Sequence, residues 1–316
     1  MPKLDADYVY HLAMGSHALA QQLAQLETGP ASKKRKLHVV RKKTELLKAV
    51  YPEKMAGLED TVQYSALPSL VGQHEDEDTR RTLLIDLMFS DPFAPYELKY
   101  KKSDMDKALA EVAKTLGLSK ADVTSIRATQ AAAARAHVAR NTATVVVVGT
   151  GAAAVVAIGA ALAGPAIGGA LGATVYGLYG AAATSSGLAL LGGGSLAAGG
   201  FGMAGGMWVI AGAGAAVGLA GGSGTTLMMQ LGTRGTKAEL IKLQVTYKEV
   251  LLRTQAEAAK AQKVTIDLAT RQEELRTQLA EERELNDRNA QRLKNLEDTI
   301  QAVGHSLDWM KKLSRR

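Results

Sequence analysis

The central stretch of the chain, residues 141–233, contains no Asp, Glu, Lys, Arg or His, although charged residues make up 22% of the sequence. The same stretch holds 25 of the 32 glycines, and Ala, Val, Leu and Ile supply most of the remainder. Uncharged runs of this length are typical of membrane segments or of the fully buried interior of a domain. Arranged as helices joined by turns, the stretch is long enough for roughly four bilayer crossings at ~20 residues each. We call residues 141–233 the apolar block.

Small residues recur at every fourth position within the apolar block. Three such runs occur, namely Gly164, Gly168 and Gly172; Gly194, Ala198, Gly202 and Gly206; and Gly214, Gly218 and Gly222. This spacing places a smooth stripe on one face of a helix, so a second helix can approach to backbone contact inside a bilayer. In water, each glycine would cost roughly 1 kcal/mol in helix propensity relative to Ala, so helices here require close packing. The pattern predicts glycine-zipper helical hairpins that form homo-oligomers.

The apolar block has two further interpretations. A flexible Gly/Ala linker would carry Ser or charge and would lack the bulky apolar runs found here. Residues 145–148, followed by Gly149, Gly151 and Ala154, outline a dinucleotide-binding turn. That fold requires an acidic residue ~20 positions later, whereas the next acidic residue is Glu239. The membrane interpretation is therefore favoured over both.

The free energy that favours insertion of this block into a bilayer is smaller than its lack of charge suggests. Transfer free energy scales with buried apolar area at ~25 cal/mol per Å², and Gly and Ala offer little area. Such a segment suits a protein that assembles before or while it enters the bilayer, with a soluble form before insertion. A stably inserted helical bundle is the alternative.

The composition divides the chain into three segments of an all-α protein. These are an N-terminal helical domain at 1–140, the apolar block at 141–233, and a charged C-terminal helix or coiled coil at 234–316. The net charge of +7 is spread over both flanks. This mild basic excess does not require nucleic acid, and it fits an anionic membrane surface.

Basic residues stand on both sides of the apolar block. They are Arg127, Arg135 and Arg140 before it, and Arg234, Lys237 and Lys242 after it. Loops rich in Arg and Lys remain on the cytoplasmic side, so both flanks and both termini are expected there, with an even number of crossings, two or four. Arg140 and Arg234 are expected at the membrane surface.

The first 65 residues contain apolar positions at helical spacing, which predicts one or two amphipathic helices with a break at 28–30. The positions are Tyr10, Leu12, Leu19, Leu23 and Leu26. The densest basic run of the chain follows, and it begins with Lys33, Lys34, Arg35 and Lys36. A solvated helix start is the default for such a run, and binding of lipid headgroups is the functional alternative. Nucleic acid is not expected, because no aromatic residues are interleaved for base stacking.

A small helical domain is predicted between residues 79 and 126. Ser103 with Asp106, and Ser119 with Asp122, have the spacing of capping boxes. Between them, one helix face is lined by Met105, Leu109, Val112 and Leu116. The acidic run HEDED at 74–78 is expected to be solvated rather than to bind a divalent metal.

Two stretches carry resemblances to known families. Around residues 80–126, an apolar helix, a DPFA turn and a helix ending in LGLSKADV resemble the TerB-like helical modules of stress and defence proteins. Residues 185–206, SSGLALLGGGSLAAGGFGMAGG, resemble glycine-rich segments of bacterial membrane-associated proteins and the interferon-inducible glycine-zipper family. The second resemblance implies membrane association and no enzymatic activity.

The C-terminal segment is predicted to form a long charged helix of coiled-coil type. Heptad spacing is good at both ends, at Leu240, Leu243, Tyr247 and Val250 and again at Leu293, Leu296, Ile300, Val303, Leu307 and Met310. In the middle a continuous register places polar residues such as Gln272 on the apolar positions. The helix is expected to pair with the N-terminal helices, to self-associate or to bind a protein partner, or to lie in water.

The C-terminal end carries Trp309, Lys311 and Lys312. These residues are either a membrane-surface contact or a helix end stabilised by cations, and the second is favoured.

No constellation of nucleophile and base, phosphate loop or metal-spaced histidines is present, and cysteine is absent. The N-terminus is too polar for a secretory signal. We expect a protein without enzymatic activity or cofactor, whose partners are a lipid bilayer and further copies of itself. The leading hypothesis is a pore-forming or membrane-perturbing effector, related to defence or toxicity. The alternative is a membrane-anchored coiled-coil interaction scaffold.

Overall fold

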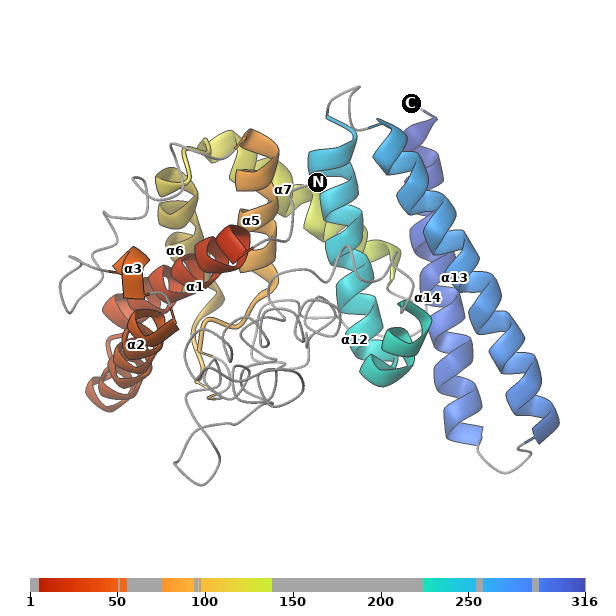
Figure 1. Cartoon of the computed structure of the whole chain (residues 1–316), viewed down its shortest axis with the longest axis horizontal. Coiled ribbons are helices and arrows are strands. Elements are labelled where there is room, and N and C mark those ends of the chain that lie inside the picture. The colour runs from red at the N-terminus through yellow and green to blue at the C-terminus, as the bar shows by residue number, and fades with distance from the viewer. Residues whose placement is uncertain are drawn as a thin grey trace.

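The computed structural model of the 316-residue chain describes residues 6–50, 52–55, 76–93, 96, 98–137, 224–253, 258–285 and 290–315. Helices supply all of the regular secondary structure in these ranges (Figure 1). The all-α prediction is confirmed. The three glycine-zipper runs and Arg140 lie outside the described residues. Among the described helices, none combines the length and the apolar character that a membrane crossing requires.

The chain begins with α1 (Ala6–Leu26), α2 (Pro30–Val50) and the short α3 (Pro52–Met55). The predicted break at 28–30 is confirmed, because α1 ends at Leu26 and α2 begins at Pro30, which suits the first turn of a helix. Four of the five predicted apolar positions of α1 are buried, and Leu26 is partly exposed. Gly15 allows close approach to α5 (Glu77–Phe89), since a Cβ there would lie 2.6 Å from Leu87 Cδ1.

Three helices continue the N-terminal flank, namely α5 (Glu77–Phe89), α6 (Lys102–Thr115) and α7 (Lys120–Ala136). Asp76 of the acidic run caps α5 by accepting the Thr79 N–H, so this carboxylate is a helix cap. The predicted face of Met105, Leu109, Val112 and Leu116 is buried throughout. This face joins α6 to a core shared with α1 and α5.

The turn between α6 and α7 is determined by two local signals. Gly117 has φ +67°, and its N–H donates to the Lys114 carbonyl at 3.1 Å, while the Leu118 N–H donates to the Ala113 carbonyl at 2.9 Å. This bonding pattern ends a helix with a left-handed residue, which glycine adopts without strain. The capping box of Ser119 and Asp122 then starts α7 as predicted.

The capping box predicted at Ser103 is wrong. Helix α6 begins at Lys102, its N-cap is Lys101, and no side chain caps it. Asp104 stands in the first turn instead, where a carboxylate interacts favourably with the helix dipole. Asp106 forms an ion pair with Arg127 of α7 rather than with the backbone of its own helix.

The C-terminal segment is not one long helix, and this part of the prediction needs correction. It consists of α12 (Gly224–Thr246), the π-helical turn η3 (Tyr247–Leu251), α13 (Ala258–Leu285) and α14 (Ala290–Ser314). Most of the predicted apolar positions are buried, and they pack α14 against α12 and against α13, whereas Val250 joins the N-terminal core. The α13–α14 hairpin also accommodates Gln272, whose amide donates to the Ile300 carbonyl at 3.2 Å, over Gly304.

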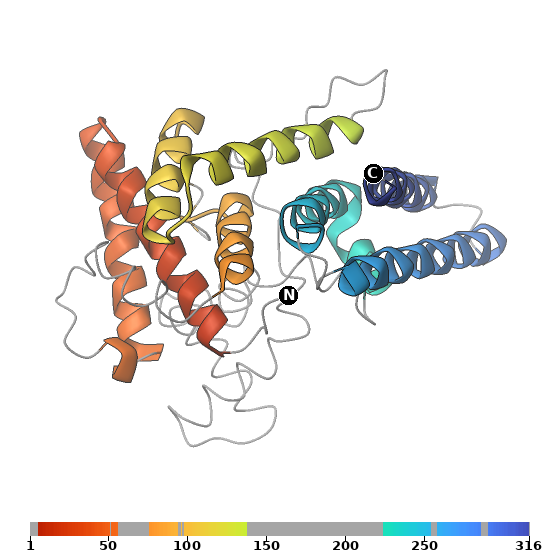
Figure 2. The ribbon, with the colours of Figure 1, turned by 90° about the horizontal axis from the view of Figure 1, so that it is seen from above.

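Helix α12 is the central element of the described fold. Figure 2 shows it between the N-terminal helices on one side and the α13–α14 hairpin on the other. It packs against α5, α7 and α14. Ile241, Val245 and Val250 belong to the same hydrophobic cluster as the N-terminal helices. The two flanks therefore share one core, which is one of the three arrangements expected for the C-terminal segment.

Candidate functional site

Charged and polar side chains gather where α5 and α7 meet α12 and η3. We call this set the charged seam; its members are Arg81, Asp86, Asp122, Ser125, Thr129, Glu239, Lys242 and Glu249. Pairs across it join residues 120 or more positions apart in the chain. A protein interior rarely holds so many ionisable groups, so this contact between the flanks is unusual.

The ion pair of Asp86 and Lys242 lies in the most buried part of the seam. Lys242 Nζ is 2.5 Å from Asp86 Oδ1, and the two side chains are 4% or less exposed. Burial acts to lower the pKa of Lys242, but the carboxylates of Asp86 and Glu239 raise it above its ordinary value. Lys242 is therefore a buried cation whose charge depends on neighbouring anions. Loss of either partner would leave an uncompensated charge in the interior.

Glu239 is the least satisfied member of the charged seam. Its side chain is fully buried, and neither carboxylate oxygen has a hydrogen-bond partner among the described residues. Burial raises the pKa of Glu239 to about 7; Lys242 opposes this rise and Asp86 adds to it. Near neutral pH this carboxyl is therefore close to its titration midpoint.

Glu249 lies in the π-helical turn η3, and its carboxylate accepts hydrogen bonds from side chains of α7. Ser125 Oγ donates to its two oxygens at 3.1 and 2.9 Å, and Thr129 Oγ1 donates to Oε1. Arg81 of α5 approaches the same carboxylate at 3.7 Å and also pairs with Asp122. A π turn inserts one extra residue into a helix, and such turns occur frequently at functional sites. In this protein the π turn follows α12 and contacts both α5 and α7.

The end of α7 is attached to the C-terminal segment through His137. His137 Nε2 lies 3.0 Å from Gln244 Oε1 of α12 and 3.2 Å from Ser306 Oγ of α14. Burial lowers the pKa of His137 to about 4; Gln244 opposes this shift, and His305 and Lys237 add to it. His137 is thus neutral at physiological pH. It is also the last residue described before the apolar block, and the described chain resumes at Gly224, within the last ten residues of the block.

The two helices next to the apolar block lie side by side. Helix α7 ends shortly before the apolar block, α12 contains the last ten residues of the block, and the two helices pack against each other. The described residues on either side of 138–223 therefore belong to a single helical body.

The basic run lies on α2, and its four predicted surface residues differ in exposure. Lys34 and Arg35 are exposed and Lys33 is half-buried, as a surface role requires. Lys36 is buried, so its prediction as a membrane-surface residue needs correction. Its Nζ pairs with Glu27 Oε2 at 2.7 Å and lies 5.6 Å from the centre of the Phe93 ring. The fourth cation of the run therefore stabilises the contact of α2 with the rest of the N-terminal flank.

The other predicted surface residues lie in the C-terminal helices. Lys311 and Lys312 are exposed in the last turn of α14, which is the favourable end of the helix dipole for cations. Trp309 packs partly against the C-terminal hydrophobic cluster. Arg234 lies within α12. These positions agree with the structural role favoured for the C-terminal end.

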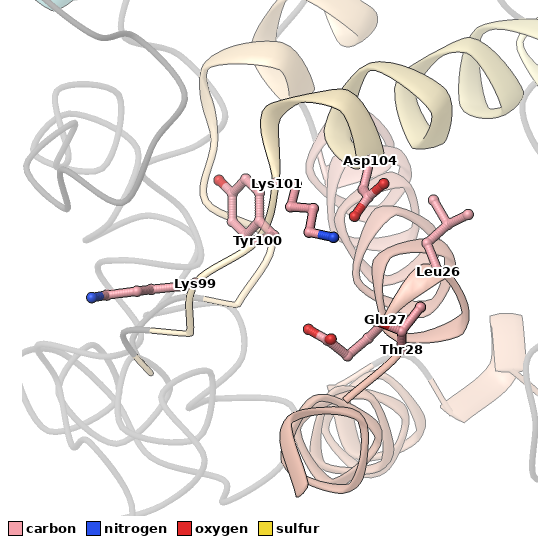
Figure 3. Close-up of a pocket in the computed structure, with 7 residues that line it drawn as sticks. All are labelled: Leu26, Glu27, Thr28, Lys99, Tyr100, Lys101 and Asp104. Carbon is pink, nitrogen blue, oxygen red and sulfur yellow. The ribbon is translucent and has the colours of Figure 1, made fainter. Parts of the chain in front are cut away.

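A small open pocket lies between the end of α1 and the segment before α6 (Figure 3). Its volume is about 200 Å³, and its lining combines three charged side chains on the α6 side with Glu27 on the α1 side. Hydrogen bonds from Lys36, the Gly29 N–H and Ser32 lower the pKa of Glu27 to about 2. These three partners satisfy the Glu27 carboxylate, so Glu27 contributes to the structure at the end of α1.

Within the ranges that the structure describes, no cluster of three or more His, Asp or Glu side chains could hold a metal ion. Asp76 and Glu77 of the acidic run act as a helix cap and as an ion-pair partner of Arg81 and Arg253, at 3.2 and 2.5 Å. His74 and Glu75 lie outside the described residues. Comparisons with protein-family models, curated proteins and solved structures found no match.

The charged seam is the feature that sequence reasoning missed. Glu239 and Lys242 flank Leu240 and Ile241 in α12, and all four residues are buried. Charged residues beside apolar ones in a helix are the sequence signal that could have indicated the seam. The signal does not identify the partners, since Asp86 precedes Lys242 by more than 150 positions in the chain. Helical periodicity alone treats both residues as part of a solvated face.

Proposed function

We propose that the chain is a non-enzymatic, membrane-associated protein that oligomerises through its glycine zippers and permeabilises or perturbs a bilayer. The observation that carries the proposal is that α7, which precedes the uncharged, glycine-rich block, and α12, which contains its last residues, are attached to one helical body. A block that starts and ends on one body enters and leaves a bilayer from the same face. This arrangement supports an even number of crossings with both flanks cytoplasmic, as the basic residues on both sides also indicate.

The charged seam contributes the geometry that a helical hairpin in a membrane needs. It ties α5 and α7 to α12 through buried pairs such as Asp86–Lys242, and such pairs provide register more than net stability. The entry and exit helices are thereby held at a defined distance and orientation. Glycine stripes can then meet face to face, because close approach requires aligned helices.

The glycine stripes are tested by the double variant Gly168→Leu/Gly218→Leu. The added side chains increase apolar area but hold neighbouring backbones apart, so we expect membrane binding to be retained and oligomerisation and leakage to be lost. Crosslinking in vesicles and release of an encapsulated dye measure the two properties together. A growth assay in cells that express the protein provides an independent measure of toxicity.

The matched control for this experiment is Gly169→Leu/Gly212→Leu, which adds the same side chains away from the four-residue stripes. We expect this control to assemble and to cause leakage as the parent does. If the stripe variant behaves like the control, the glycines are not a contact surface and the proposal fails in its present form.

A membrane-anchored interaction scaffold is the second candidate. The α13–α14 hairpin favours it, because α13 lies at the outer edge of the molecule in both views and presents an exposed, charged surface (Figures 1 and 2). A scaffold binds vesicles without releasing their contents. Parent protein that is integral to vesicles but causes no leakage at any protein-to-lipid ratio would favour the scaffold over the pore.

A further inference from the structure

Helix α2 presents a strongly basic outer face. Its exposed residues Lys34, Arg35, His38, Arg41 and Lys42 fall on one side of the helix at intervals of three and four. We call these five residues the α2 basic face. The opposite side of α2 is buried and includes Val40 and Leu47. The helix therefore has an apolar side toward the core and a cationic side toward solvent.

Most of this positive charge is not neutralised within the protein. Of the cations on the face, Lys42 pairs with the exposed Glu45 at 3.2 Å, whereas Lys34, Arg35 and Arg41 have no carboxylate partner among the described residues. The side chain of Arg41 instead lies 3.5 Å from His38 Nδ1. Unpaired surface cations at this density attract anions and bind extended anionic surfaces.

Two other cations of the basic run are directed inward. Lys36 pairs with Glu27 under the ring of Phe93. Lys43 Nζ donates to Ser16 of α1 at 2.8 Å, and burial lowers the pKa of Lys43 to about 8, while Asp91 opposes this shift. The basic run therefore contains two kinds of cation. Lys36 and Lys43 stabilise the fold, whereas the residues of the α2 basic face remain available to a partner.

Leu37 adds an apolar element beside the α2 basic face. Its side chain is 41% exposed, and it belongs to the few large hydrophobic residues that are exposed in the described ranges. An apolar residue among cations is typical of helices that lie on a membrane, where the chain enters the boundary of headgroups and acyl groups. No aromatic side chain stands on this face for base stacking.

The helix that carries this face also lies at one end of the described fold. Helices α1 and α2 form the end of the molecule opposite to the α13–α14 hairpin in both views (Figures 1 and 2). The main packing partners of α2 among the described elements are α1 and α3. The residues of the α2 basic face are exposed and can contact a large flat surface.

We propose that the α2 basic face docks the cytoplasmic flank onto anionic phospholipid headgroups, a partner assignment that rests on the proposed membrane function. Its cations complement the negative charge of the headgroups, and Leu37 contacts the acyl boundary. Each Lys or Arg near an anionic membrane contributes about fivefold in affinity. The contact orients the flank beside the bilayer that the apolar block enters.

The test measures binding of the full-length protein to vesicles of phosphatidylcholine alone and of phosphatidylcholine with phosphatidylserine. The variant is Lys34→Gln/Arg35→Gln/Arg41→Gln, and the control is Lys107→Gln/Lys114→Gln/Lys120→Gln, which removes three exposed cations from α6 and α7. We expect the variant to lose roughly a hundredfold in affinity for the anionic vesicles and the control to lose little. Binding to neutral vesicles through the apolar block should be the same for all three proteins. Thermal unfolding checks that each is folded.

The inference is overturned if the parent shows no preference for anionic vesicles, or if variant and control lose affinity equally. It is also overturned if the variant loses binding to duplex DNA while its anionic preference is intact, because the face would then serve nucleic acid. Dye release from the same vesicles is recorded separately. Parent protein that shows an α2-dependent anionic preference but never releases dye would support the docking face and contradict the proposed permeabilisation.

Discussion

The N-terminal core and the charged seam are both buried contacts between helices, but different forces hold them. In the core, Leu19, Leu87 and Leu109 pack α1, α5 and α6 together, and each is 2% or less exposed. Burial of such side chains contributes about 2 kcal/mol each and depends little on direction or pH. In the seam, Asp86 and Lys242 lose hydration on burial, and their ion pair compensates for part of that loss.

This difference indicates what each region does. An apolar core tolerates small shifts and stabilises the flank as a bundle. A charged seam admits one register, because any displacement separates the paired groups. The N-terminal flank is therefore held together by apolar area, whereas its attachment to α12 combines apolar contacts with buried charged pairs that specify the register. Four substitutions test this contrast, and they follow from the largest expected effect to the smallest.

Substitution of Lys242 by Met should have the largest effect. It retains a long apolar stem but leaves Asp86 and Glu239 as buried carboxylates without their cation, so we expect a loss of about 4 kcal/mol in the free energy of unfolding. Urea unfolding at neutral pH measures the loss, and hydrogen exchange should show it first in α12. Lys237→Met, on the same helix but partly exposed, is the control and should change stability little. An unchanged urea midpoint for Lys242→Met would show that the pair does not join the flanks.

Substitution of Leu109 by Ala tests the apolar region with an effect of about 3 kcal/mol. Leu109 is 2% exposed in the core of α6, so the loss combines transfer free energy with an unfilled cavity. Since no charge is involved, the same decrease should appear at every pH where the protein is folded. Lys107→Ala provides an exposed control on the same helix. A decrease that varies strongly with pH would mean that the core is coupled to the seam.

The raised pKa of Glu239 predicts that the free energy of unfolding depends on pH. The pKa of Glu239 is about 7 in the folded protein, against an ordinary value of 4.5 in the unfolded chain. Its contribution to the free energy of unfolding is therefore complete below pH 4.5 and is lost as pH rises to about 7. That loss amounts to roughly 3 kcal/mol. His137 acts in the opposite direction, because its pKa falls from 6.5 to about 4 and its contribution is lost as pH falls through this range. His17 in the N-terminal flank has the same sign as His137, with a pKa lowered to about 4.

The variant Glu239→Gln separates these opposed contributions. We expect it to be more stable than the parent above pH 7, by up to roughly 3 kcal/mol, because no buried carboxylate forms. Its stability should rise from pH 4 to pH 6.5 and then stay level, as the two histidines dictate. Urea midpoints measured across this range for parent and variant provide the comparison. Parallel curves for the two proteins would exclude Glu239 as a titrating group of the seam.

Substitution of Arg283 by Ala should have the smallest effect. Arg283 pairs with Glu297 at 2.5 Å across the α13–α14 hairpin, but the two side chains are 58% and 42% exposed. An exposed pair of this kind contributes only about 0.5 kcal/mol, and salt screens it. Thermal unfolding at low and high salt should show a slight difference that disappears at high salt. A loss as large as that of Lys242→Met would mean that burial does not distinguish the two pairs.

Several local features can be predicted from the sequence because short-range chemistry determines them. The break at 28–30, the capping box of Ser119 and Asp122, and the buried face that includes Leu109 follow from spacing and residue type. Helical periodicity also identifies the apolar positions around Leu243 and Leu307. Each of these depends on residues within a few turns of one another, where geometry is the same in every protein.

The tertiary structure alone decided where those helices are paired. The heptad pattern of residues 234–316 is equally satisfied by one long helix and by helices that fold back, and the packing of α14 between α12 and α13 selects the second. The burial of Lys36 depends on Glu27 and Phe93, and that of Lys242 depends on Asp86. A charged residue is solvated or buried according to whether a distant partner reaches it. The sequence by itself determined the uncharged, glycine-rich composition of the apolar block. Helices α7 and α12 lie on one body because apolar and charged residues that are far apart in the chain meet in the tertiary structure.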